Sequence, residues 1–273
     1  MDADETLVLL ASCLLTTVVG TRWYASLVRR TLTPQRSSLV TRLLLFALPL
    51  VLLMALAVTL VTGAAREVRE HGEYVVLFLA LGASWLIGLA WALAWLGIHV
   101  RDDALERNNV AAAVAASGAL SGGMIVYGGA NLGEGATIWM TIGPALLGTV
   151  SILSLWGAHQ VLSGATDAIV LDRDVASGIR FAGMTLGTGL IFGRTLAGDY
   201  VSGLETVRDL LVQSWPAVPL VALSLLLQLK LRPTPAQPKP NAVTRGLLPA
   251  LGYLVLGVGA LFWLGPNPIG TKQ

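Results

Sequence analysis

Long apolar segments alternate with short polar ones along the whole of this 273-residue chain. The hydrocarbon core of a bilayer is about 30 Å thick, and a helix needs about 20 residues to cross it. Eight segments reach about that length, and the connections between them hold nearly all the ionisable residues. This pattern predicts an all-α integral membrane protein with about eight transmembrane helices. The predicted spans cover residues 6–28, 39–62, 74–99, 110–130, 138–163, 175–196, 210–229 and 246–264.

Composition agrees with a membrane protein and excludes several other classes. Hydrophobic residues make up 55% of the chain and charged residues 12%, about half the charged share of a soluble domain. The net charge of +2 gives no basic surface for nucleic acid. The single cysteine, Cys13, excludes an internal disulfide and a thiolate metal cluster. No two of the three histidines are three or four residues apart, so we expect neither a metal nor another cofactor.

The lysines and arginines between the spans predict the orientation of the chain, because they are more frequent on the cytoplasmic side. If the N-terminus lies outside, the cytoplasmic connections hold 12 of them and the outer connections hold 5. We therefore expect both termini on the outer side. The residues before the first span include Asp2, Asp4 and Glu5, whereas a signal peptide begins with basic residues, so we expect the first span to be retained.

Two pairs of segments repeat along the chain. Residues 109–128 align on residues 174–193 without a gap, at an offset of 65, and Val, Ala and three glycines coincide. Residues 40–48 match residues 243–251 at an offset of 203. Fixed offsets of this kind indicate a structure built from repeated units.

Four predicted helix starts recur at steps of 71, 65 and 67 residues, at Ser38, Asn109, Asp174 and Asn241. Side chains of these types accept hydrogen bonds from the free N–H groups of a first helical turn. We therefore predict a single polytopic domain, residues 1–273, built from four tandem two-helix units with one orientation. The units cover approximately residues 6–63, 74–131, 137–197 and 207–265.

Aligned glycines set the two middle units apart from the flanking ones. Gly118 and Gly122 occupy one helix, and Gly183 and Gly187 occupy the matching helix of the next unit. Small residues four apart let the backbones of membrane helices approach closely. We expect these two helices to be central and to pack on each other. The alternative is that glycine is simply frequent in membrane helices.

The same two helix starts resemble a bacterial membrane family, domain of unknown function 350, also called uncharacterised protein family 0719. Residues 107–118 and 172–183 each contain a capping residue, an alanine-containing turn and a glycine nine residues after the cap. The resemblance covers roughly residues 74–196, and the chain departs from it in Asp174, where Asn is usual, and in its flanking units. It implies a multi-pass protein of the bacterial inner membrane, linked to envelope physiology, with no established reaction.

Ionisable residues inside membrane spans are costly, so each is a functional candidate. Arg180 either extends to the interface or pairs with a nearby acid such as Asp167, and Arg194 with Glu134 forms either an ion pair or a gate. His159 is either a pH-sensitive group or a helix-end residue satisfied at the interface.

The starts of the two glycine-rich helices are also candidates, because a helix N-terminus attracts anions. Asn108, Asn109, Arg173 and Asp174 gather there, although simple capping explains them equally well. The sequence contains no nucleophile elbow, phosphate loop or His-Glu-x-x-His motif, so we expect no enzyme and no catalytic residues.

Two functions remain open. The first is a channel or permease for an ion or small solute, with a path along the central helices. The second is a membrane scaffold or adaptor that oligomerises or binds membrane-stress proteins; lipid modification is a more distant third. The expected partners are the lipid bilayer, further copies of the chain and membrane-stress proteins. The candidate permeation or packing residues are Asn109, Asp174, Arg180, Arg194, His159, Gly118, Gly122, Gly183 and Gly187.

Overall fold

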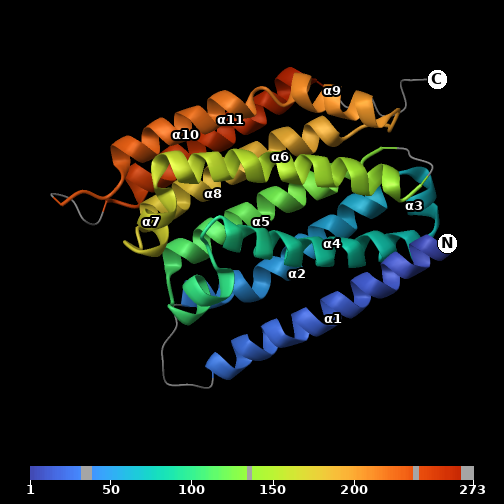
Figure 1. The fold of residues 1–273 in the computed structure, drawn as a ribbon, viewed down its shortest axis with the longest axis horizontal. Helices are drawn as coiled ribbons and strands as arrows, with labels where there is room; N and C mark the ends of the chain where they lie inside the picture. Colours follow the sequence, from blue (N-terminus) through green and yellow to red (C-terminus); the bar gives the residue numbers. More distant parts are fainter. Residues whose placement is uncertain (32–38, 134–136, 236–239, 266–273) are drawn as a thin grey trace.

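The computed structural model describes residues 1–31, 39–133, 137–235 and 240–265, and every long regular element in this part of the chain is a helix (Figure 1). Seven of these helices are long and apolar enough to cross a membrane, and α9 with α10 forms an eighth candidate that is bent by 47°. The protein is therefore a multi-pass, all-helical membrane protein. The α-helices are α1 (Ala3–Thr31), α2 (Leu39–Gly63), α3 (Arg66–Glu70), α4 (Gly72–Trp95), α5 (Val110–Ala130), α6 (Trp139–Ser163), α7 (Ala165–Val170), α8 (Val175–Leu196), α9 (Gly203–Gln213), α10 (Ala217–Leu231) and α11 (Leu248–Leu264).

The seventh predicted span differs most from the structure. Instead of one helix over residues 210–229, the chain forms α9 and α10, with the break at Ser214–Pro216. Proline has no N–H to donate and its ring clashes with the carbonyl four residues before it, so α9 ends ahead of Pro216. The last span begins earlier than predicted, because a π-helical turn, Val243–Leu247, leads into α11. A second such turn, Val100–Glu106, follows α4.

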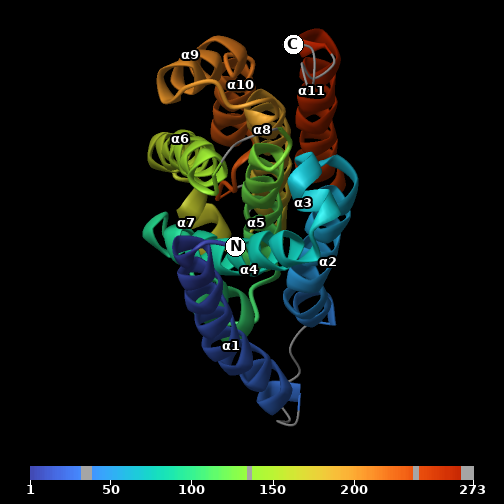
Figure 2. The same ribbon diagram turned by 90° about the vertical axis from the view of Figure 1, so that its right-hand side faces the viewer.

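Helices α5 and α8 form the centre of the bundle. They share the most extensive contact between any two described helices, α11 packs on the other side of α8, and α2 packs on α5 (Figure 2). Within their membrane windows α5 is 78% buried and α8 is 72% buried, against 17% for α2 and for the segment that contains α11. The central position of the two glycine-rich helices agrees with the sequence prediction.

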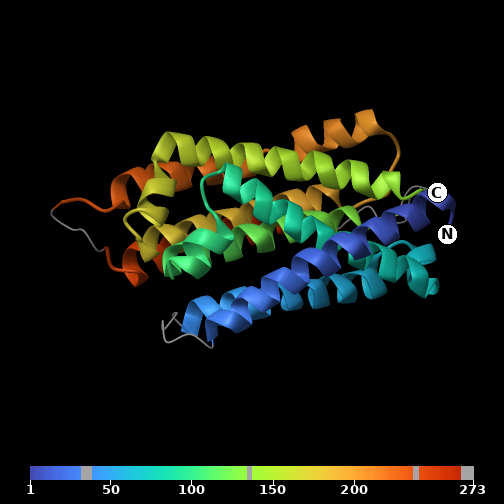
Figure 3. The same cartoon turned by 60° about the horizontal axis from the view of Figure 1, so that its bottom comes forward.

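The helices run between two ends of the bundle. The end where α1 begins is called the start end below, and the end where α5, α8 and the α11 segment begin is called the cap end (Figure 1). Helix α1 lies along the edge of the bundle and packs mainly on α4 (Figure 3). It is 11% buried in its membrane window, as expected for a helix that faces lipid.

Candidate functional site

Three of the four predicted capping residues begin helices at the cap end. The side chains of Asn109, Asp174 and Asn241 each accept hydrogen bonds from the backbone N–H groups two and three residues further on. These distances lie between 2.8 and 3.2 Å. The fourth predicted cap, Ser38, lies outside the described residues. The capping interpretation of these residues is therefore confirmed for the three that are described.

The loops before α5 and α8 follow the same course. In each loop the residue before the cap has a left-handed backbone, with φ of 51° at Asn108 and 54° at Arg173. The backbone N–H of Asn109, and that of Asp174, donates to the carbonyl six residues earlier. The Asn109 amide also donates to the carbonyl of Ile169, at 2.8 Å. The N–H groups of residues 109, 111 and 112, and those of residues 174, 176 and 177, thus have protein acceptors, which counts against an anion site there.

The glycines of α5 bring its backbone against that of α8. A Cβ atom built on Gly118 would lie 2.4 Å from the Cα atom of Ala182. One built on Gly122 would lie 2.3 Å from the carbonyl oxygen of Thr185. Real Cβ atoms do not approach other atoms this closely, so only glycine fits at either position. The contact leaves no room for a solute between α5 and α8.

Gly183 and Gly187 serve a different interface from the predicted one. Instead of facing α5, they face α11: a Cβ atom built on Gly183 would lie 2.6 Å from the Cα atom of Ala250. One built on Gly187 would lie 2.8 Å from the carbonyl oxygen of Tyr253. The physical reason is that α8 is in contact on two sides, and its other glycines, such as Gly193, meet α5.

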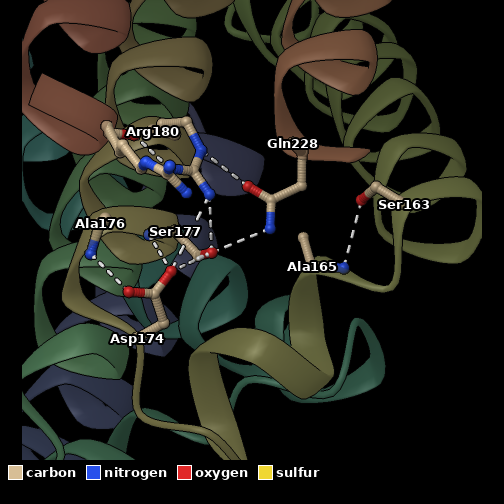
Figure 4. A network of polar contacts seen from close by, with 8 residues as sticks. Ser163, Ala165, Asp174, Ala176, Ser177, Arg180 and Gln228 are labelled. Carbon is tan, nitrogen blue, oxygen red and sulfur yellow. Dashed lines mark hydrogen bonds and ion pairs between the residues drawn. The ribbon is translucent and has the colours of Figure 1, made fainter. Parts of the chain in front are cut away.

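Arg180 is the centre of a buried polar network at the cap end (Figure 4). Its side chain is 1% exposed, and its Nε–H donates to Oε1 of Gln228 at 2.9 Å. Its Nη2 donates to the Ser177 hydroxyl at 2.9 Å and lies 3.9 Å from Oδ2 of Asp174. Its Nη1 donates to the backbone carbonyl of Arg245. These contacts join α8 to α10 and to the start of the α11 segment.

Of the two sequence expectations for Arg180, extension to the interface is wrong, whereas pairing with a nearby acid is confirmed with a different acid from the one named. The side chain does not extend to the interface, and the acid it approaches is Asp174 rather than Asp167. The reason is that Ser177 and Gln228 complete a closed set of donors and acceptors. The Ser177 hydroxyl donates to Asp174 at 2.6 Å and accepts from the Gln228 amide at 2.9 Å. The paired guanidinium and carboxylate then carry no net charge.

His159 forms a second buried polar contact with α10, beside this network. It is 2% exposed, so it is not a residue satisfied at the interface, and its Nε2 forms a hydrogen bond with the Ser224 hydroxyl at 3.2 Å. Its Nδ1 and the hydroxyl of the fully buried Tyr253 have no hydrogen-bond partner among the described residues. The name cap-end cluster is used below for the seven residues of this region. They are His159, Asp174, Ser177, Arg180, Ser224, Gln228 and Tyr253.

Sequence reasoning missed the contribution of α10. Ser224 and Gln228 are four residues apart in an otherwise apolar helix, and both are 1% exposed. Residues four apart share one face of a helix. The spacing of these two polar residues in the sequence could therefore have predicted that α10 turns a polar face toward the bundle.

Arg194 lies near the opposite end of α8 and lines a pocket of about 90 Å³ at the start end. Its Nε and Nη2 donate to the carbonyl of Gly265, at 3.2 and 2.8 Å. Glu134, its predicted partner, lies outside the described residues. The described residues form no group of three His, Cys, Asp or Glu placed to hold a metal ion. The polar side chains that line this start-end pocket are Arg194, Thr195, Asp199, Tyr200, Glu205, Thr206, Asp209 and Gln213.

Comparison with known protein families gives a match for the central part of the chain. Residues 64–196 match the model of the family described as Domain of Unknown Function (DUF350). The match spans α3 to α8, with both capped loops and the α5–α8 contact, and it confirms the resemblance drawn from the sequence. No curated protein and no solved structure matches the chain.

Proposed function

We propose that this protein, whose residues 64–196 match the DUF350 family, is a channel or permease for an ion or small solute in the bacterial inner membrane. The observation that carries the proposal is that one group of C-terminal helices encloses polar side chains at both ends of the bundle. The start-end pocket lies among α6, α8 and α9. The cap-end cluster lies among α6, α8, α10 and α11.

The proposed path follows the side of α8 that faces the C-terminal helices, rather than the close contact between α5 and α8. Between the pocket and the cluster, α8 carries the buried hydroxyls of Thr185 and Thr188. Thr188 accepts a hydrogen bond from the Trp156 indole at 2.9 Å, so a polar contact with α6 lies at this level as well. Ionisable residues inside a membrane bundle mark solute and proton paths, and Arg180, Asp174 and His159 of the cap-end cluster are of this kind.

Orientation and repeat structure complete the proposal. The excess of lysine and arginine in the cap-end connections supports a cytoplasmic cap end and outer termini. The hydrogen bonds shared by the starts at Asn109, Asp174 and Asn241 support four tandem two-helix units. The units then cover residues 6–63, 74–131, 137–197 and 207–265, as proposed from the sequence.

Flux into proteoliposomes tests this function. The purified protein is assayed with a panel of inorganic ions and polyamines, beside Glu205→Gln and Asp209→Asn in the pocket. Asp4→Asn, an exposed acid at the start of α1, is the matched control. We expect flux that one or both pocket variants alter and the control does not. Absence of flux across the panel would contradict the proposal.

A scaffold or adaptor is the second candidate, and a specific observation favours it. The only fully buried arginine among the described side chains is neutralised by a nearby carboxylate, and the central helices pack backbone to backbone. This candidate predicts a stable oligomer or a defined membrane-stress partner in native lipid, and no conductance. Native mass spectrometry of the protein in lipid nanodiscs distinguishes a monomer from an oligomer.

A further inference from the structure

Helix α9 is amphipathic, but its polar face turns toward the protein and its apolar face turns outward. Its polar side chains Glu205, Thr206, Asp209 and Gln213 line the start-end pocket and so face α6 and α8. Four of its five large apolar side chains point away from the rest of the chain, whereas Leu210 is buried. The exposed Arg208, four residues from Leu204, shares the outward face. Leu204 is 83% exposed, Leu211 72%, Val212 63% and Val207 38%. A surface helix in water turns its apolar side to the protein, so the surroundings of α9 are not aqueous.

We propose that the apolar face of α9, formed by Leu204, Val207 and Leu211, lies against the acyl chains of the leaflet at the start end. The helix then forms the outer half of a broken span and separates the polar pocket from lipid. This proposal concerns the placement of α9 and does not depend on whether a solute is transported.

Two further observations favour lipid as the occupant of this face. Helices α9 and α10 meet the length and hydropathy requirements of a span only when taken together, across a bend of 47°. At the bend, Trp215 packs edge to face on Trp263 at the end of α11, with ring centroids 5.5 Å apart. Both indoles are at least half exposed, so large apolar side chains are exposed at the bend as well as on α9.

Depth-dependent fluorescence quenching tests the proposal in the full-length protein in liposomes. The background variant is Cys13→Ala, because Cys13 is the single cysteine of the chain and is exposed. Leu211→Cys reports the apolar face, and Gln213→Cys, two residues further on, reports the pocket face of the same helix. Each is labelled with a small environment-sensitive fluorophore. The quenchers are doxyl-labelled phosphatidylcholine in the bilayer and iodide in the water.

We expect the label at Leu211→Cys to lose more fluorescence with doxyl lipid than with iodide, and the label at Gln213→Cys to show the opposite order. Stronger iodide quenching at Leu211→Cys would overturn the proposal, because the face would then lie in water. Protection of that label from both quenchers would also overturn it, because a second copy or another protein would then cover the face. A size-exclusion profile matching the parent protein shows that each variant is folded.

Discussion

Replacing Gly118 by alanine tests whether backbone contact between α5 and α8 holds the centre of the protein together. The new Cβ atom would lie 2.4 Å from both Cα and Cβ of Ala182 and 2.8 Å from its carbonyl oxygen. Ordinary contacts begin near 3.4 Å, so the two helices must separate locally by about 1 Å. No side-chain rotation relieves the clash, because the opposing atoms are backbone atoms and a Cβ.

Gly128→Ala is the matched control, since it lies in the same helix and a Cβ built there meets nothing within 4 Å. Both variants gain the same intrinsic helix propensity, about 0.5–1 kcal/mol, so their difference isolates the overpacking. Overpacking a tight core costs about 1–3 kcal/mol, and we expect Gly118→Ala to be less stable than Gly128→Ala by that amount.

The assay is equilibrium unfolding of the purified variants in mixed micelles with increasing sodium dodecyl sulfate, followed by far-ultraviolet circular dichroism. A difference between the two variants below about 0.5 kcal/mol, the usual range for substitutions without a structural role, would refute the reasoning. It would mean that the α5–α8 interface yields freely, and that the glycines do not hold the helices together.

Two further predictions concern the cap end. Arg180→Met should lower the free energy of unfolding by about 3–5 kcal/mol, because it leaves the buried carboxylate of Asp174 without its cation. Adding Asp174→Asn should recover part of that loss. Equal losses in the single and double variants would contradict the pairing. Asn109→Ala should cost about 0.5–2 kcal/mol, more than Asn241→Ala, because Asn109 is buried and also donates to the Ile169 carbonyl. The same unfolding assay measures both, and a larger loss at the exposed Asn241 would contradict the second.

The elements of this fold follow from local sequence to different extents. Spans are predictable because each needs only a long apolar segment, and the starts at Asn109 and Asp174 are predictable because a cap acts on its own first turn. The break before Pro216 was not predicted, since proline also fits near a helix start, and only tertiary packing decides between a start and an interruption.

The candidate site was predictable residue by residue but not as an arrangement. Arg180 is identified by its charge inside an apolar helix, yet its partner Gln228 lies 48 residues further on, in another helix. Nothing in the local sequence fixes which helix faces which. Gly183 and Gly187 show the same limit: their spacing indicates close packing, but their neighbour is α11 rather than α5.

Chemical modification of the start-end pocket during transport tests the central claim most directly. Proteoliposomes containing Gln213→Cys in the Cys13→Ala background are assayed for flux before and after treatment with a charged methanethiosulfonate reagent, with Asp4→Cys as the control outside the pocket. A path through the C-terminal helices predicts flux that falls on modification at residue 213 and is unchanged on modification at residue 4. Flux that is insensitive to modification at both residues would contradict the account.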